Sequence, residues 1–296
     1  RSGDPIRTEL YTFKEDEGRD DLARWVSSVV LALAEGTHAE RLTPVNGPLF
    51  LDGPLYPTTV LSKIYFERGG STGTQTEYRL PDSYQMKYGR EAIQKYVDTI
   101  ENQISAGQPV IGITKSMKTA MLVNAINEKM ETADQTFEIP WTNDYPFVSS
   151  VLYTPDPQVV TFTSWLVETS REANGTNVEP LVDFEFDDDR DMKDFRRAFF
   201  YVRLPNAGPV FRIEAPLVLA VDETMSERIR MKVLKEVVEA NDIPAVVKRA
   251  DHRANITQQN SEDLKNLLRE QLTNDYNTHG RGANRRYHTG GNEHHE

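Results

Sequence analysis

Charged residues stand at the ends of strand-like runs or inside them, where the catalytic groups of α/β proteins collect. Asp52 follows the apolar run of "PLFLDGP", and Lys115 follows that of "PVIGITKS". In "VFRIEAPLVL", strand alternation puts Arg212 and Glu214 on one face and the apolar residues on the other. Because loops at the carboxyl ends of parallel strands converge on a crevice, these side chains are candidates for a shared site.

Each candidate also has a plainer interpretation. Asp before Gly, as at Asp52, is a common turn former. Arg212 and Glu214 form either a solvent-facing ion pair or part of a cleft. Lys115 either caps its strand or meets a phosphate group. Asp144 precedes an apolar stretch in "PWTNDYPFVSSVL", where a helix N-cap is the alternative to a chemical role.

The residue types available restrict the chemistry to oxygen and nitrogen ligands. The chain has no cysteine, which excludes disulfides, thiolate metal sites and cysteine nucleophiles. Four of its 6 histidines lie in the last twenty residues, where tail composition explains them. Carboxylates from distant parts of the chain, with basic residues nearby, therefore indicate a site for a hard divalent metal ion.

The charge balance limits the kinds of partner. Acidic residues outnumber basic ones by 46 to 34, so the formal charge is −12. This disfavours a protein whose whole surface binds nucleic acid, but a nuclease with a local basic cleft and a bound metal stays possible. No apolar run approaches the roughly 20 residues that cross a bilayer, and no signal-peptide pattern opens the chain. We therefore predict a cytoplasmic protein without membrane contact.

Apolar periodicity predicts the elements of the first half. It predicts helices over residues 20–35, 89–106 and 117–130, with strands that end at Asp52 and at Lys115 between them. Asp20 and Asp21 lie in the first helical turn, where the helix dipole favours anions. This order of helices and strands is typical of an α/β domain with a largely parallel core.

The second half predicts a hairpin followed by helices. Strand-like runs at 197–204 and 210–219 are joined by a Pro/Gly connection. Helices are expected at 226–241 and 261–272, and the polar tail over 273–296 is expected to be disordered. The sequence shows no phosphate-binding glycine loop, zinc-protease motif or serine-hydrolase motif. We expect one domain over 1–272.

Six segments, in their order along the chain, together resemble the NurA nuclease family. They are "LFLDGPLYPTTVL", "PVIGITKS", "PWTNDYPFVSSVL", "FTSWLV", "FFYVRL…VFRIEAP" and "IPAVVKRADHRANIT", and the resemblance runs from residue 18 to 272. The variant of the Asp-Gly-Pro motif and the acidity are most similar to NurA proteins of salt-loving archaea.

The resemblance implies an RNase H-like mixed sheet flanked by helices and an Mn²⁺- or Mg²⁺-dependent nuclease that resects DNA ends. It also implies a homodimer that docks on a HerA-type hexameric ATPase. Asp52 matches the second metal-binding aspartate of the family, with Asp20 or Asp21 as its partner from the preceding helix. Asp144 and Glu214 fall on acids typical of the family. Lys115 and Arg212 would contact DNA phosphate or balance charge.

The chain departs from the family pattern at two places. The family's first aspartate has no counterpart before Asp52, and because the chain begins at Arg1 rather than Met, we expect a fragment with that residue upstream. Near the C-terminus, Ile243 stands in the family's Tyr slot and Asp251 in its His slot, with His252 one place later. Either Asp251 or His252 could serve there. These departures leave a second interpretation open, a catalytically weak module that docks on the ATPase.

Overall fold

The computed structural model describes residues 20–57, 60, 85–115, 117, 119–133, 139–156, 158–167, 172–173, 176–177, 192–206, 208–240, 243–254, 262 and 266. The chain divides into two compact units, Arg1–Val247 and Lys248–Glu296, and each is described by itself. The predicted helix over 261–272 is described only at residues 262 and 266, and the tail from Thr273 lies outside the described residues.

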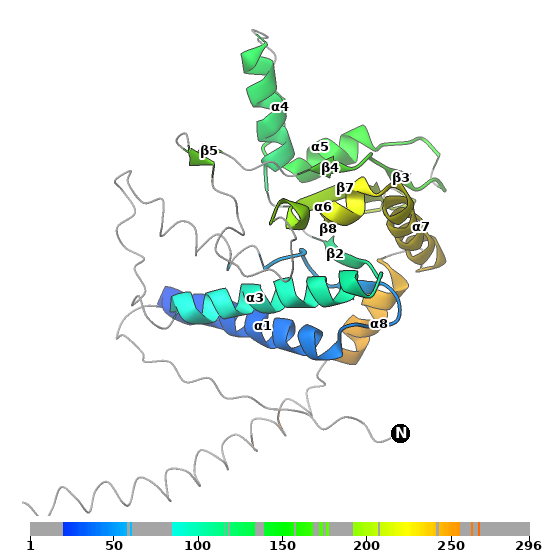
Figure 1. Ribbon diagram of the computed structural model, residues 1–296. Coiled ribbons are helices and arrows are strands. Elements are labelled where there is room, and N and C mark those ends of the chain that lie inside the picture. Colours follow the sequence, from blue (N-terminus) through cyan, green and yellow to red (C-terminus); the bar gives the residue numbers. More distant parts are fainter. Residues whose placement is uncertain are drawn as a thin grey trace, which may run out of the picture. The chain divides into compact units, whose positions relative to one another are not determined.

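The first unit is built on a mixed sheet that joins strands from both halves of the sequence (Figure 1). Its strand order is β1-β2-β8-β7-β3, and β4 also pairs with β7. The strands are β1 Leu49–Leu51, β2 Val110–Thr114, β3 Thr161–Phe162, β4 Leu166–Val167, β7 Arg197–Arg203 and β8 Val210–Pro216. This architecture confirms the predicted α/β class with a mixed sheet and flanking helices.

The expectation of a largely parallel core is wrong beyond the first two strands. Strands β1 and β2 are parallel, but β2 pairs with β8 in the antiparallel sense. The predicted hairpin is the reason: β7 and β8 are antiparallel to each other, and the sheet grows by adding β8 to the edge of β2. The second hairpin strand is also shorter than predicted, because helix α6 (Leu217–Val221) begins where β8 ends.

Two long helices, α1 (Asp20–Leu42) and α3 (Gln85–Ser105), cover the β1–β2 end of the sheet. Both are longer than the periodicity predicts. Their apolar stripes pack on each other and on β1 and β2, with Leu33, Ile93, Ile100 and Val110 almost completely buried. The loop that leads into β1 is held by Gln103 of α3, whose side-chain amide donates to two backbone carbonyl groups of this loop.

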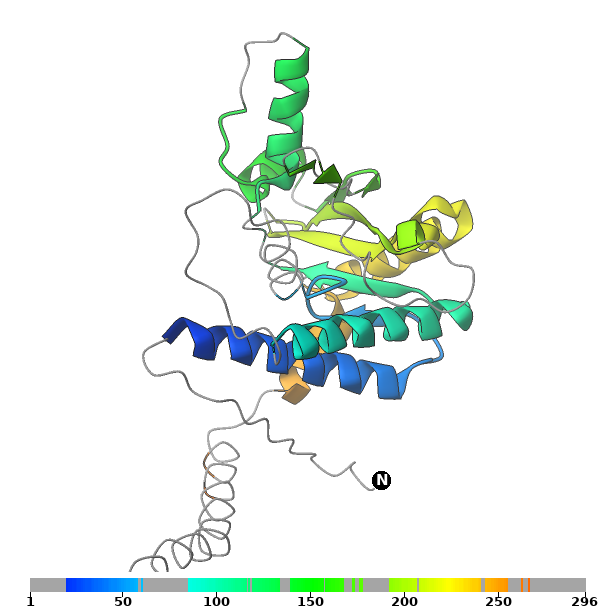
Figure 2. The ribbon, with the colours of Figure 1, turned by 60° about the vertical axis from the view of Figure 1, so that its left-hand side comes forward.

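The rest of the sheet is covered on both faces (Figure 2). On one face Ile111, Ile113 and Ile213 pack against α7 (Glu223–Ala240). On the other face Tyr201 packs against Val148 of α5 (Asp144–Val151). Helix α4 (Met121–Thr132) precedes α5 along the chain. The remaining elements are β5 Glu172–Ala173, β6 Thr176–Asn177, the 3-10 helix Met192–Phe195 and α8 Ala245–Ala254.

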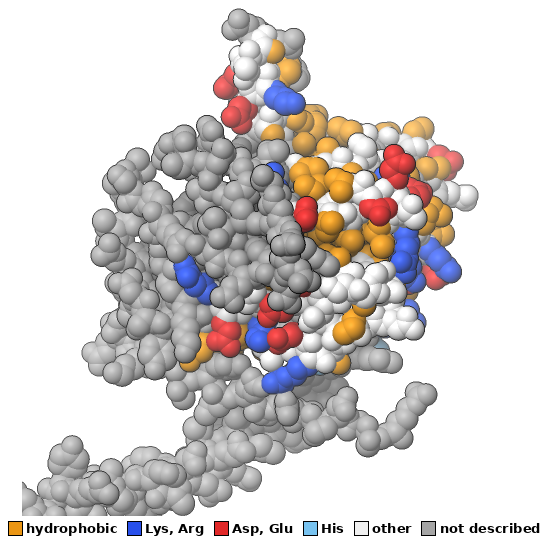
Figure 3. Space-filling view, in the orientation of Figure 1, with side chains coloured by type: hydrophobic (Ala, Val, Ile, Leu, Met, Phe, Trp, Pro, Cys, Tyr) orange, Lys and Arg blue, Asp and Glu red, His pale blue; other side chains and the backbone are white. Residues whose placement is uncertain are grey.

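Apolar side chains gather on the surface over α5, β4 and α6 (Figure 3). The exposed large apolar residues of these elements include Val151, Val167 and Val221. None of the described helices is both long and apolar enough to cross a membrane.

Candidate metal centre

Asp52 and Lys115 lie together at the carboxyl ends of β1 and β2. Strands β1 and β2 are parallel neighbours, so the residues that follow them meet at their common carboxyl end. The Lys115 ammonium lies 2.7 Å from Asp52 Oδ1 and 3.0 Å from Oδ2. Both side chains keep substantial solvent contact, with 40% of Asp52 and 32% of Lys115 exposed. The Asp52 carboxylate therefore already binds one cation, the Lys115 ammonium, at this end of the strands.

A second carboxylate, Glu35 of α1, lies near Asp52. Burial of the Glu35 carboxyl group raises its pKa, a hydrogen bond from Tyr96 opposes this rise, and the negative charge of Asp52 adds to it. The Tyr96 hydroxyl donates to Glu35 Oε2 at 3.1 Å. Because Tyr96 is itself buried, the pKa of its phenol is raised and it remains a donor at neutral pH. Glu35 and Asp52 are thus close enough for their negative charges to interact.

The structure favours Glu35 rather than Asp21 as the helical partner of Asp52. Helix α1 is continuous from Asp20 to Leu42. At 1.5 Å per residue, Asp21 lies about 21 Å from Glu35 along the helix axis, and Asp20 lies farther still. A single ion cannot bridge that distance, so the predicted role of Asp20 or Asp21 beside Asp52 is not supported.

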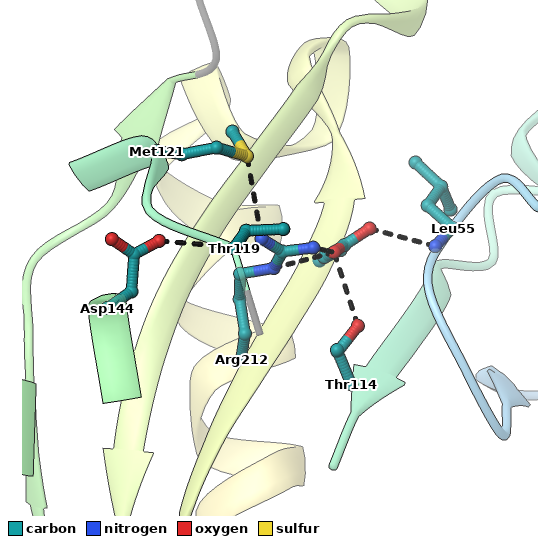
Figure 4. Close-up of polar contacts among 7 residues, drawn as sticks. Leu55, Thr114, Thr119, Met121, Asp144 and Arg212 are labelled. Atoms are coloured by element: carbon teal, nitrogen blue, oxygen red, sulfur yellow. Dashed lines mark hydrogen bonds and ion pairs between the residues drawn. The ribbon is translucent and has the colours of Figure 1, made fainter. Parts of the chain in front are cut away.

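Glu214 is buried, and it accepts hydrogen bonds from Leu55, Thr114 and Arg212, which Figure 4 labels. Its Oε2 accepts the backbone N–H of Leu55 at 2.9 Å. Its Oε1 accepts Arg212 Nε at 2.7 Å and the Thr114 hydroxyl at 3.3 Å. Only 1% of the Glu214 side chain and 6% of the Arg212 side chain are exposed. The solvent-facing ion pair predicted as one alternative is therefore wrong, and Arg212 balances charge instead of reaching solvent or a DNA phosphate.

Asp144 is also fully buried, and it caps a neighbouring helix. It begins α5, yet its Oδ1 accepts the N–H groups of Leu122 and Val123 in the first turn of α4, at 2.9 and 3.1 Å. Its Oδ2 accepts the Thr119 hydroxyl at 3.3 Å (Figure 4). The N-cap alternative thus describes Asp144, although the helix that it caps is not its own. This geometry supports a structural role rather than a catalytic one.

Comparison with protein-family models shows which family the chain belongs to. The model of the NurA domain matches residues 45–256, which is most of the chain. The chain belongs to the NurA family. No curated protein matches it in sequence at a significant level.

The fold agrees with this membership. The crystal structure of the NurA nuclease from Sulfolobus solfataricus is similar with a TM-score of 0.50 at 13% identity, over 90% of this chain and 72% of that one. An identity this low supports the fold alone. The shared fold therefore says nothing by itself about which side chains act in this NurA protein.

The C-terminal candidates of this NurA chain fall near the unit boundary. Ile243, which stands in the Tyr slot of the family pattern, is partly buried and packs against the apolar cluster between the sheet and α7. Asp251 and His252 belong to α8 within the second unit, and His252 is exposed. The centre in the first unit is described without them, so the choice between Asp251 and His252 stays a prediction.

The donor set of the centre fits a hard divalent cation. Glu35 and Asp52 offer carboxylate oxygens, the ligands that Mg²⁺ and Mn²⁺ prefer. The pKa of Glu35 is raised mainly by burial and further by the charge of Asp52, so a divalent cation bound beside the two carboxylates would favour their charged forms. Within the described part of the chain, no group of three acidic or histidine side chains lies close enough to hold a metal. A complete coordination shell therefore needs further ligands or water.

Proposed function

We propose that this NurA protein is a nuclease that hydrolyses DNA phosphodiester bonds with Mn²⁺ or Mg²⁺ held by Asp52 and Glu35. The observation that carries the proposal is that Glu35 lies close enough to Asp52, at the carboxyl end of β1, for their charges to interact, within a chain whose NurA domain spans most of its length. A divalent ion bound there would activate water and stabilise the leaving oxygen.

The residues of the chain suggest how a phosphodiester would be oriented. Lys115 now neutralises Asp52. When Asp52 acts as a metal ligand, the Lys115 ammonium at the same end of the strands offers hydrogen-bond donors to a phosphate oxygen. Tyr96 holds the Glu35 carboxylate in place by donating to one of its oxygens. The site thus combines two acids, a fixed donor and a partly exposed cation.

The finer assignments rest on family resemblance. We propose 5'-3' exonuclease and endonuclease activity in DNA end resection and double-strand break repair, an RNase H-like topology, a homodimer and a HerA-type ATPase partner. A catalytically weak module that docks on the ATPase is the second candidate. Ile243 and Asp251, which replace the Tyr and His of the family pattern, favour that candidate.

Cleavage of labelled single-stranded and double-stranded DNA tests the proposal. The wild-type chain is expected to cut in the presence of Mn²⁺ and not in EDTA, and Asp52→Ala is expected to lose cleavage. Asp156→Ala is the matched control, because Asp156 is an exposed aspartate in the segment that precedes β3, and β3 and β1 are at opposite ends of the strand order. Equal cleavage by wild type and Asp52→Ala would exclude the catalytic assignment, and a folded wild-type chain that never cuts would favour the docking module.

A further inference from the structure

The loop that carries Asp52 crosses directly over β2 at Gly112. A Cβ atom at Gly112 would lie 2.6 Å from the Leu55 nitrogen and 3.0 Å from the Gly53 oxygen, so only glycine leaves room for the crossing. Gly112 is also the residue of β2 that pairs with Glu214 of β8. The crossing therefore brings the Leu55 N–H to the Glu214 carboxylate, at 2.9 Å.

The path from Leu55 back to Asp52 is short. Residues 52 to 55 span at most about 10 Å of extended chain. Gly53 has a φ of 153°, which glycine adopts without strain, and the ring of Pro54 fixes its own φ. Because only Gly53 and Pro54 separate the two residues, the position of Leu55 restricts where the backbone of Asp52 can lie.

We infer that Glu214 is a positioning residue for Asp52, acting through the Leu55 N–H without touching metal or DNA. The inference rests on the proposed metal-dependent function of Asp52. Each Glu214 oxygen accepts a hydrogen bond within the protein, and the side chain is almost completely buried, so it lies behind the loop and out of contact with solvent. Arg212 supplies the opposite charge that allows a carboxylate to be buried there.

Two double variants isolate the hydrogen bond to Leu55 from the charge pair. Removing Glu214 alone would leave Arg212 as an unpaired buried charge and could unfold the chain. Arg212→Met/Glu214→Met and Arg212→Met/Glu214→Gln both lack the ion pair and keep similar side-chain volumes. Only the Gln variant retains an oxygen that can accept the Leu55 N–H. The difference between the two variants therefore reports on the hydrogen bond between the Leu55 N–H and residue 214.

Three measurements on the full chain compare these variants. Hydrogen exchange of the peptide that contains residues 52–56 is expected to be fast in the Met variant and slow, as in wild type, in the Gln variant. The Mn²⁺ dissociation constant, from the electron paramagnetic resonance of free Mn²⁺, is expected to rise about 10–100-fold in the Met variant only. The KM for DNA at saturating Mn²⁺ is expected to stay unchanged in both variants.

Two results would overturn the inference: equal exchange of residues 52–56 in both double variants, or fast exchange in the Met variant with an unchanged Mn²⁺ dissociation constant. A wild-type chain that neither binds Mn²⁺ nor cuts DNA would instead refute the proposed function. In that case the exchange comparison still decides whether Glu214 holds the loop.

Discussion

The Lys115 ammonium lies 2.7 Å from Asp52 Oδ1, at the carboxyl ends of two adjacent parallel strands. A lysine in this position neutralises the carboxylate that we assign to metal binding, so Lys115 and a divalent ion compete for Asp52. The same ammonium is exposed enough to meet a phosphate group. We therefore expect Lys115 to have opposite effects on metal binding and on DNA binding.

Replacing Lys115 with alanine is expected to separate these effects. Exposed ion pairs contribute about 0.2–1 kcal/mol, so Mn²⁺ should bind roughly 1.5–5-fold more tightly to Lys115→Ala. The KM for DNA should rise, because a phosphate contact is lost. Isothermal titration with Mn²⁺ and steady-state cleavage measure the two quantities.

Lys235→Ala is the control for this prediction, since Lys235 is an exposed lysine paired with Glu239 on α7. It should change neither quantity. Weaker Mn²⁺ binding by Lys115→Ala would contradict competition for Asp52.

Glu35→Gln is expected to stabilise the metal-free protein and to remove its response to Mn²⁺. The pKa of Glu35 is raised mainly by burial and further by Asp52, so its charged form opposes folding at neutral pH. Glutamine removes that charge and still accepts the Tyr96 hydroxyl. Thermal unfolding at pH 7 with and without Mn²⁺ measures both effects.

The wild-type Tm should rise in Mn²⁺, because 100-fold excess over the dissociation constant contributes about 2.7 kcal/mol. For a domain of this size that is roughly 5–11 °C. Glu40→Gln is the control, because Glu40 lies on the same helix but pairs with Lys95. A full Mn²⁺ response in Glu35→Gln would remove Glu35 from the metal site.

Variants of Asp144 are expected to lower stability without abolishing catalysis. Asp144→Ala leaves the N–H groups of Leu122 and Val123 without their buried acceptor, which costs about 1–3 kcal/mol. Asp144→Asn retains one acceptor oxygen and should lose less. Denaturant unfolding gives the free energies, and cleavage below the unfolding temperature gives kcat. A folded Asp144→Asn protein with kcat reduced a hundredfold would restore Asp144 to the catalytic residues.

Gly112→Ala is expected to displace the loop that carries Asp52. Its methyl group would lie 2.6 Å from the Leu55 nitrogen, and overpacking of this kind costs about 1–3 kcal/mol. Mn²⁺ affinity should fall together with stability. Ile113→Val is the neighbouring control: it removes one methylene from the opposite face of β2, so it should cost about 0.5–1.5 kcal/mol and leave Mn²⁺ affinity unchanged. Normal Mn²⁺ binding by Gly112→Ala would show that the loop tolerates displacement.

Local periodicity was enough to predict the main helices, the β7–β8 hairpin and the strand ends at Asp52 and Lys115. Each of these elements buries one face, and the spacing of apolar residues within the element itself shows which face that is. The position of Glu35 follows from the observed end of α1 at Leu42, seven residues beyond the end that periodicity predicted. Seven helical residues before Leu42 and three strand residues after Leu49 both span about 10 Å, so a helix that folds back onto β1 places Glu35 near Asp52.

The partners of buried polar groups could not be predicted in this way. The antiparallel pairing of β2 with β8 joins Gly112 to Glu214, and the Leu55 N–H meets a carboxylate 159 residues away. Asp144 caps α4 because α5 packs beside it, although the local sequence indicates only a cap for its own helix. Periodicity records which face of an element is buried, but a hydrogen bond between distant residues depends on how whole elements pack, so these roles became visible only in the assembled fold.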